Sequence, residues 1–187
     1  MELPSEIKNK FFRALTGDIA MEVFEMWVYS DTKLEKYLSS DAYMELISLS
    51  YKKGDKYELR KFLKNYIDEG ELEAHKMLNL LKEAQLKTSR LPYILIELYD
   101  LYCKGYDFLQ NIALQFGLAV AAPTVANSTA DSWEELTIEQ QNEILKSFSS
   151  KLDDCIDEAI NWLETKKIII TGEQNEIGHF QYKDLRT

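Results

Sequence analysis

The chain has 187 residues, of which 45% are hydrophobic and 29% charged, and 32 acidic against 22 basic side chains give it a formal net charge of −10. Its apolar content suffices for a folded core, and seven glycines and three prolines are too few for a fibrous or disordered chain. Because negative charge repels phosphate backbones and anionic lipid heads, the composition disfavours nucleic acid and membranes as partners and favours a basic protein.

The N-terminal part of the sequence shows helical periodicity. Apolar residues recur at helical spacing between Ile7 and Leu15, and Gly17 is expected to end this helix. A second helix is expected from Ile19 to Val28, with Asp18 as its N-cap. The residues Thr32-Lys33-Leu34-Glu35 have the pattern of a capping box that opens a third, short helix.

Longer helices are expected further along. Helical patterns cover 40–51, 55–69 and 71–85, and Gly70 is expected to cap the second of these at its C-terminus. Pro92 suits the first turn of a helix that Gly105 ends. The stretch 108–130 carries no charged residue, and we expect it to form a buried helix over 108–122 followed by a polar loop, because its apolar part is too short to span a bilayer.

The C-terminal part combines the longest expected helix with two short strands. Thr137-Ile138-Glu139-Gln140 has the pattern of a second capping box, opening a helix to about Thr165. β-Branched residues over 167–171, turn residues over 172–175 and a second apolar run over 177–182 predict a hairpin, which must dock on the helices or on a partner. The sequence thus predicts a mainly α fold: one domain over 1–187, a multi-helix bundle with a small C-terminal β-hairpin.

The net negative charge is concentrated in one segment near the C-terminus, which includes the last helix. Between Asp131 and Glu164 ten acidic residues face only Lys146 and Lys151, which places −8 of the net −10 in this segment. On a helical wheel Ile138, Leu145, Phe148, Leu152, Ile156, Ala159 and Leu163 share one face. The opposite face carries the acidic strip, formed by Glu139, Glu143, Asp153, Asp154, Asp157 and Glu158. Such a strip either keeps the protein soluble or docks a basic partner. Each pair of carboxylates one turn apart lowers the stability of the helix by about 0.2–0.5 kcal/mol.

Residues for catalysis or metal binding are sparse. The only histidines are His75 and His179; Glu71 and His75 are four residues apart on one expected helix, but a metal site needs three or four ligands. No phosphate-binding glycine motif and no nucleophile elbow occurs. Cys103 and Cys155 are expected to be free, buried thiols, and Trp27, Trp133 and Trp162 to be packing anchors. The sequence therefore predicts no enzyme, no cofactor and no metal site.

Three segments between residues 24 and 83 carry a resemblance to a known group. They are Phe24-Glu25-Met26-Trp27-Val28-Tyr29, Leu34-Glu35-Lys36-Tyr37-Leu38 and Tyr43-Met44-Glu45-Leu46-Ile47-Ser48-Leu49-Ser50-Tyr51. This pattern resembles small acidic immunity-type proteins encoded beside bacterial polymorphic or contact-dependent toxins. The resemblance implies a stoichiometric inhibitor held in the cytosol that blocks a toxin domain by occlusion, and it supplies no catalytic residue.

The sequence leaves three functions open. The first is an immunity-type binding protein in the cytoplasm, since the N-terminus lacks the basic start and apolar run of a signal peptide, with the acidic strip as the contact for a basic partner such as a toxin domain. The second is a helical enzyme or small-molecule sensor with an apolar pocket between the helices around Tyr93 to Phe116. The third is a structural or oligomer-forming helical protein.

Overall fold

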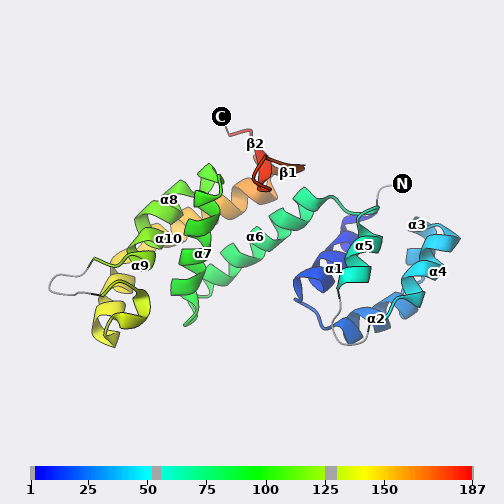
Figure 1. The fold of residues 1–187 in the computed structure, drawn as a ribbon, viewed down its shortest axis with the longest axis horizontal. Coiled ribbons are helices and arrows are strands. Elements are labelled where there is room, and N and C mark those ends of the chain that lie inside the picture. Colours follow the sequence, from blue (N-terminus) through cyan, green and yellow to red (C-terminus); the bar gives the residue numbers. More distant parts are fainter. Residues whose placement is uncertain (1–2, 52–55, 125–129, 187) are drawn as a thin grey trace. The chain divides into compact units, whose positions relative to one another are not determined.

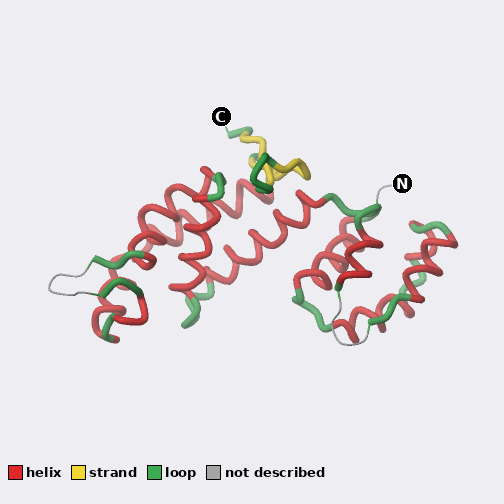
Figure 2. Tube along the Cα trace, viewed as in Figure 1, coloured by secondary structure: helices red, strands yellow, loops and turns green. Residues whose placement is uncertain are grey.

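The computed structural model describes residues 3–51, 56–124 and 130–186. The chain divides into two compact units, the N-terminal unit Met1–Leu72 and the C-terminal unit Glu73–Thr187, which are described separately below. Helices make up most of both units, and the strands form a hairpin near the C-terminus (Figures 1 and 2). The mainly α fold with a C-terminal hairpin is confirmed, and the single domain stays a prediction.

The N-terminal unit consists of short helices around an aromatic core. Its helices are α1 (Ser5–Thr16), α2 (Met21–Ser30), α3 (Leu34–Tyr37), α4 (Ser40–Ser48), α5 (Tyr57–Leu63) and the beginning of α6 (Glu69–Gln85). Phe11 and Phe24 are fully buried with ring centroids 6.0 Å apart. The Trp27 ring packs against both and the Tyr51 ring against Phe24, with centroids 5.5–5.8 Å apart. The Tyr51 hydroxyl donates a hydrogen bond to the Leu46 carbonyl at 2.6 Å, and burial raises the pKa of this phenol.

The caps expected at the starts of α2 and α3 are wrong. Gly17 ends α1 with φ +91°, as predicted, but Asp18 accepts a hydrogen bond from the Thr16 hydroxyl at 2.6 Å and does not cap α2. The expected capping box after it is also absent, since the Asp31 carboxylate accepts from the Lys33 N–H at 2.7 Å and α3 starts at Leu34 without a side-chain cap. Local side-chain hydrogen bonds compete with caps for the same carboxylates and hydroxyls.

The break between α5 and α6 comes earlier than expected. Helix α5 ends at Leu63, and Gly70 lies inside α6 instead of capping the preceding helix. The carboxylate of Asp68 accepts a hydrogen bond from the Glu71 N–H at 2.9 Å, which is the geometry of an N-cap. This side-chain cap starts α6 before the glycine, so the glycine's flexibility does not decide the boundary.

The C-terminal unit contains the longer helices. Its elements are the rest of α6, α7 (Leu91–Cys103), the 3₁₀ turn η2 (Asp107–Leu109), α8 (Gln110–Ile112), the π-helical turn η3 (Ala113–Gly117), α9 (Leu118–Ala121), the 3₁₀ turn η4 (Trp133–Glu135), α10 (Ile138–Glu164), β1 (Ile168–Gln174) and β2 (Phe180–Asp184). Pro92 lies in the first turn of α7 and Gly105 has φ +102°, as predicted. The capping box of Thr137 and Gln140 at the start of α10 is confirmed in both of its hydrogen bonds.

The charge-free helix from 108 to 122 is less regular than the sequence predicts. It passes from a 3₁₀ turn through an α turn and the π turn η3 into α9. At Gly117 an added Cβ would lie 2.7 Å from the Leu95 carbonyl oxygen and 2.8 Å from the Tyr99 Cβ. Glycine therefore permits the close approach of η3 to α7.

The hairpin docks on the helices of its own unit. Strands β1 and β2 are antiparallel, with Ile168 opposite Asp184 and Ile170 opposite Tyr182. Ile168 and Ile170 are buried in the core that α7 and α10 share, and the Tyr182 ring lies 5.4 Å from that of Phe108. This contact with the helices supplies the support that an isolated hairpin lacks.

Residues after the second strand add a polar contact with α10. The Arg186 guanidinium lies 4.2 Å above the Trp162 ring. Hydrogen bonds from Arg186 lower the pKa of Asp184 to about 2. The three tryptophans pack as expected: Trp133 is buried, Trp162 holds this arginine and Trp27 lies in the aromatic core of the N-terminal unit.

Candidate functional site

The longest helix, α10, is amphipathic as the sequence predicts. Leu152, Ile156, Ala159 and Leu163 are buried in the core of the C-terminal unit. Ile138 is an exception, because its side chain is 72% exposed although the helical wheel places it on the core face. The first turn of α10 extends past the core, which the periodicity of the sequence does not reveal.

The acidic strip divides into two sets of carboxylates. Asp153 forms an ion pair with Lys87 at 2.7 Å, and Asp157 accepts a hydrogen bond from the Gln85 side chain at 2.6 Å. About two turns further along α10, Glu164 pairs with Lys82 at 2.6 Å. Along these contacts α10 and the end of α6 run in opposite directions, and the contacts form a polar seam between the two helices. Asp153 and Asp157 of the acidic strip therefore have polar partners within the C-terminal unit, while their role in binding stays a prediction.

The other four carboxylates of the acidic strip are exposed and can contact a partner. Glu139, Glu143, Asp154 and Glu158 are exposed, and none forms a hydrogen bond or ion pair through its carboxylate with another residue of the described ranges. We refer to these four residues as the acidic face. Each consecutive pair is one helical turn apart, and the two pairs are separated by about 16 Å along the helix at 1.5 Å per residue. The acidic face thus consists of two carboxylate pairs without an ion-pair partner in the described chain, although Glu158 lies near enough to Arg186 for a weaker charge–charge attraction.

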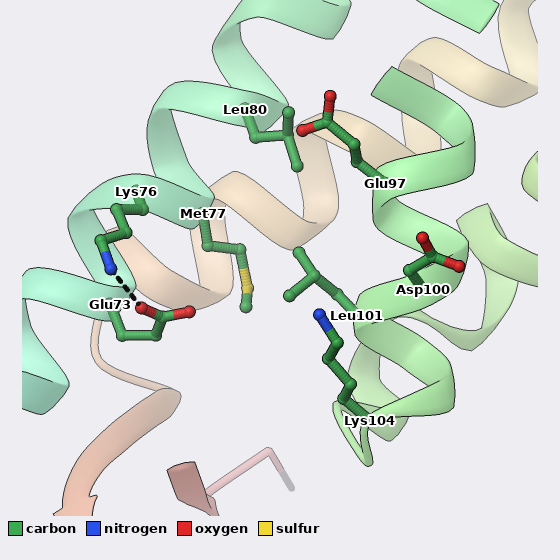
Figure 3. A pocket seen from close by; sticks show the side chains of 8 residues that line it. All are labelled: Glu73, Lys76, Met77, Leu80, Glu97, Asp100, Leu101 and Lys104. Atoms are coloured by element: carbon green, nitrogen blue, oxygen red, sulfur yellow. Dashed lines mark hydrogen bonds and ion pairs between the residues drawn. The ribbon is translucent and has the colours of Figure 1, made fainter. Parts of the chain in front are cut away.

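A pocket of about 270 Å³ lies between α6 and α7 (Figure 3). Met77, Leu80 and Leu101 form its apolar part. The rest of its lining is charged and consists of Glu73, Lys76, Glu97, Asp100 and Lys104. The sequence-based alternative places an apolar pocket around Tyr93 to Phe116; the α6–α7 pocket shares the α7 part of this range but has a charged rim.

Several charges around the α6–α7 pocket are neutralised. Glu73 pairs with Lys76 at 2.9 Å and Glu97 pairs with Arg90 at 3.1 Å. Asp100 and Lys104 form no ion pair with any residue that the structure describes. The pocket therefore offers one carboxylate and one ammonium group beside an apolar floor, which suits a small polar or zwitterionic molecule better than an apolar one.

The histidines and cysteines form no site together. Nε2 of His75 lies 3.2 Å from the Asn79 amide nitrogen, while Glu71 accepts from Lys8 at 2.9 Å. In the described ranges no three histidine, cysteine or acidic side chains are close enough to hold a metal ion. Both cysteines are free, but Cys103 is exposed, contrary to expectation, because it lies in the last turn of α7. Cys155 is half-buried, and its burial raises the pKa of the thiol.

Comparisons with known proteins give no relative from which a function can be transferred. No family model matches the sequence, and no curated protein and no solved structure is significantly similar to the chain. None of the helices in the described ranges has the length and apolar character needed to cross a membrane. Any functional assignment must therefore rest on the surface chemistry described above.

Proposed function

We propose that the chain is a cytoplasmic, immunity-type binding protein that neutralises a basic toxin domain by stoichiometric occlusion, with the acidic face as its contact. The observation that carries this proposal is the set of four exposed carboxylates on α10 that form no hydrogen bond or ion pair with the rest of the described chain. Like charges one turn apart cost stability, so a structural role does not explain them. A complementary basic surface would remove that repulsion.

The expected energetics are those of an exposed electrostatic contact. Each exposed ion pair contributes about 0.2–1 kcal/mol, so four pairs together give roughly 1–4 kcal/mol. Such charges act mainly on the association rate and on discrimination between partners. At 0.15 M ionic strength the Debye length is about 8 Å, so the two carboxylate pairs, about 16 Å apart, act almost independently.

A charge-reversal experiment tests this proposal. Glu139→Lys with Glu143→Lys is compared with the matched control Glu173→Lys with Glu176→Lys, which changes the net charge equally at exposed positions of the C-terminal hairpin. Association with a synthetic lysine-rich helix, which stands in for the basic surface of the partner, is measured by biolayer interferometry at 50 and 300 mM NaCl. We expect the first variant to associate about tenfold more slowly at low salt and the control to change less than threefold. Equal behaviour of the two variants refutes the role of the acidic face.

A second candidate function follows from the α6–α7 pocket. Asp100 and Lys104 without ion-pair partners beside Met77 and Leu101 favour a small-molecule sensor or enzyme with a polar ligand. A thermal-shift screen against metabolites and divalent metals distinguishes this function from the first. A stabilising ligand whose effect disappears in Leu101→Trp supports the second candidate, and a screen without such a ligand argues against it.

A further inference from the structure

A second pocket, of about 550 Å³, lies in the C-terminal unit between η3–α9 and α10. Leu114, Leu118 and Ala119 line one side, and Ile144, Ser147 and Phe148 line the other. The Leu114 and Leu118 side chains are 40% and 38% exposed. Among the described residues that line this α9–α10 pocket none is acidic, and Lys151 contributes the single charge.

The α9–α10 pocket borders the acidic face along α10. Glu143 precedes the lining residue Ile144 directly and lies one turn before Ser147. At 100° per residue, the α10 residues of the pocket lie about 20–120° to one side of Asp154 on the helix circumference. The residues of the polar seam with α6 lie about 60–100° to the other side. The C-terminal part of the acidic face is therefore bordered by α6, and the part at Glu143 is bordered by the pocket.

The pocket favours an apolar side chain over a cation, although Gln115, Thr124 and Ser147 add polar groups to its lining. A cation placed inside it would meet no carboxylate and would be repelled by Lys151, whereas Leu118, Ile144 and Phe148 offer apolar contact. Its volume lies within the range of about 300–1,000 Å³ in which proteins enclose small ligands or anchoring side chains. A second copy of the chain is disfavoured, because a copy presenting the same surface would bring two acidic faces together.

The arrangement of charge therefore selects a partner with segregated faces. Cations are attracted to Glu139 and Glu143, while apolar side chains are accepted one helix flank away. An amphipathic helix with Lys or Arg along one side and Leu, Ile or Phe along the adjacent side has this pattern, and helices commonly bind in apolar grooves.

We propose that the α9–α10 pocket is the anchor site of the interface, receiving the apolar side chains of a basic amphipathic helix whose cations lie on the acidic face. This inference rests on the proposed function and adds the class of partner segment to it. In protein interfaces the buried apolar anchor supplies most of the affinity, and rim charges supply rate and specificity.

The probe for this proposal is a pair of fluorescein-labelled 18-residue synthetic helices. One has leucines on one face and lysines on the other, and the second has the same lysines but glutamines in place of the leucines. Binding to the full chain is measured by fluorescence anisotropy at 150 mM NaCl. The variants are Ala119→Trp, which fills the pocket, and Leu118→Ser; the controls Leu86→Trp and Leu86→Ser alter a leucine that is 71% exposed and lies outside both pockets.

We expect the leucine helix to bind at least about tenfold more tightly than the glutamine helix, because burying one or two leucines contributes at least that factor. Ala119→Trp and Leu118→Ser should remove this difference, and the Leu86 controls should keep it. Circular dichroism establishes that each variant is folded. Methyl NMR shifts at Leu118 and Ile144 on adding the leucine helix locate the binding.

Three outcomes overturn the anchor site. The two helices bind equally, or the pocket variants leave the difference intact, or sedimentation shows a dimer that Ala119→Trp dissociates, in which case the occupant is a second copy. If the pocket variants have no effect while Glu139→Lys with Glu143→Lys abolishes binding, the acidic face is a contact and only the proposal of the anchor site is refuted. If that charge reversal has no effect either, the proposed function fails with it.

Discussion

Replacing Gly117 by alanine should destabilise the C-terminal unit, although alanine is the better helix former. The added Cβ would stand 2.7 Å from the Leu95 carbonyl oxygen and 2.8 Å from the Tyr99 Cβ. Both distances are well below ordinary contact, and the carbonyl belongs to the backbone of α7, so no side-chain rotation relieves it. Helix α7 and the π turn η3 must move apart.

The expected magnitude is the difference of two terms. Overpacking of a well-packed site costs about 1–3 kcal/mol. Replacing glycine by alanine in a helix raises the stability by about 0.5–1 kcal/mol, because alanine loses less conformational freedom on folding. We therefore expect a net loss of roughly 0.5–2 kcal/mol for Gly117→Ala, and a larger loss for Gly117→Leu, which cannot fit beside Leu95 at all.

Urea unfolding followed by tryptophan fluorescence measures this loss. In a Trp27→Phe background the signal comes from Trp133 and Trp162, which both belong to the C-terminal unit. Gln115→Ala, at an exposed position of the same π turn, is the matched control and should stay within about 0.5 kcal/mol of the parent. If Gly117→Ala is as stable as the parent or more stable, the close approach of η3 to α7 is refuted.

Three further predictions concern the same unit. Thr137→Ala removes one bond of the capping box and should cost about 1 kcal/mol in urea unfolding, while an unchanged midpoint would contradict the cap. A double-mutant cycle of Lys87→Ala and Asp153→Ala should give a coupling energy below about 1 kcal/mol, because both side chains are about half exposed. The coupling energy should fall further in 1 M NaCl, and a value of several kcal/mol would contradict this prediction. Burial, with a smaller contribution from Glu73, raises the pKa of Tyr106 to about 12, so its neutral form stabilises the fold fully below pH 10 and this contribution is lost as the pH rises towards 12. Tyr106→Phe should make stability less dependent on pH between 10 and 12, and an unchanged alkaline slope would contradict the assignment.

Periodicity and local signals predicted most of the helices because they depend on neighbouring residues. The capping box of Thr137 and Gln140 is a short-range pattern, and the structure has it as predicted. Gly17 and Gly105 end their helices for a similarly local reason, a positive φ that glycine adopts easily. Predictions failed where two local partners competed, as at Asp18, or where an earlier side-chain cap set the boundary, as at Asp68.

The candidate site was only partly predictable. The sequence located the carboxylates on one side of α10, since their spacing follows the helical repeat. It did not reveal that Lys87 and Gln85 bind Asp153 and Asp157, because these pairs join residues more than 60 positions apart. The α9–α10 pocket was missed as well, although the charge-free stretch that forms one of its walls was visible.

The amino-acid sequence by itself determined that this protein is mainly helical, that a hairpin follows the last helix and that most of its net negative charge lies between Asp131 and Glu164. These properties depend on residue type and on spacing within a few turns. The tertiary structure alone decided which carboxylates are neutralised and which remain open, and it formed both pockets. Contacts between distant segments depend on how the helices pack, and helix packing is not encoded in any single stretch of the chain.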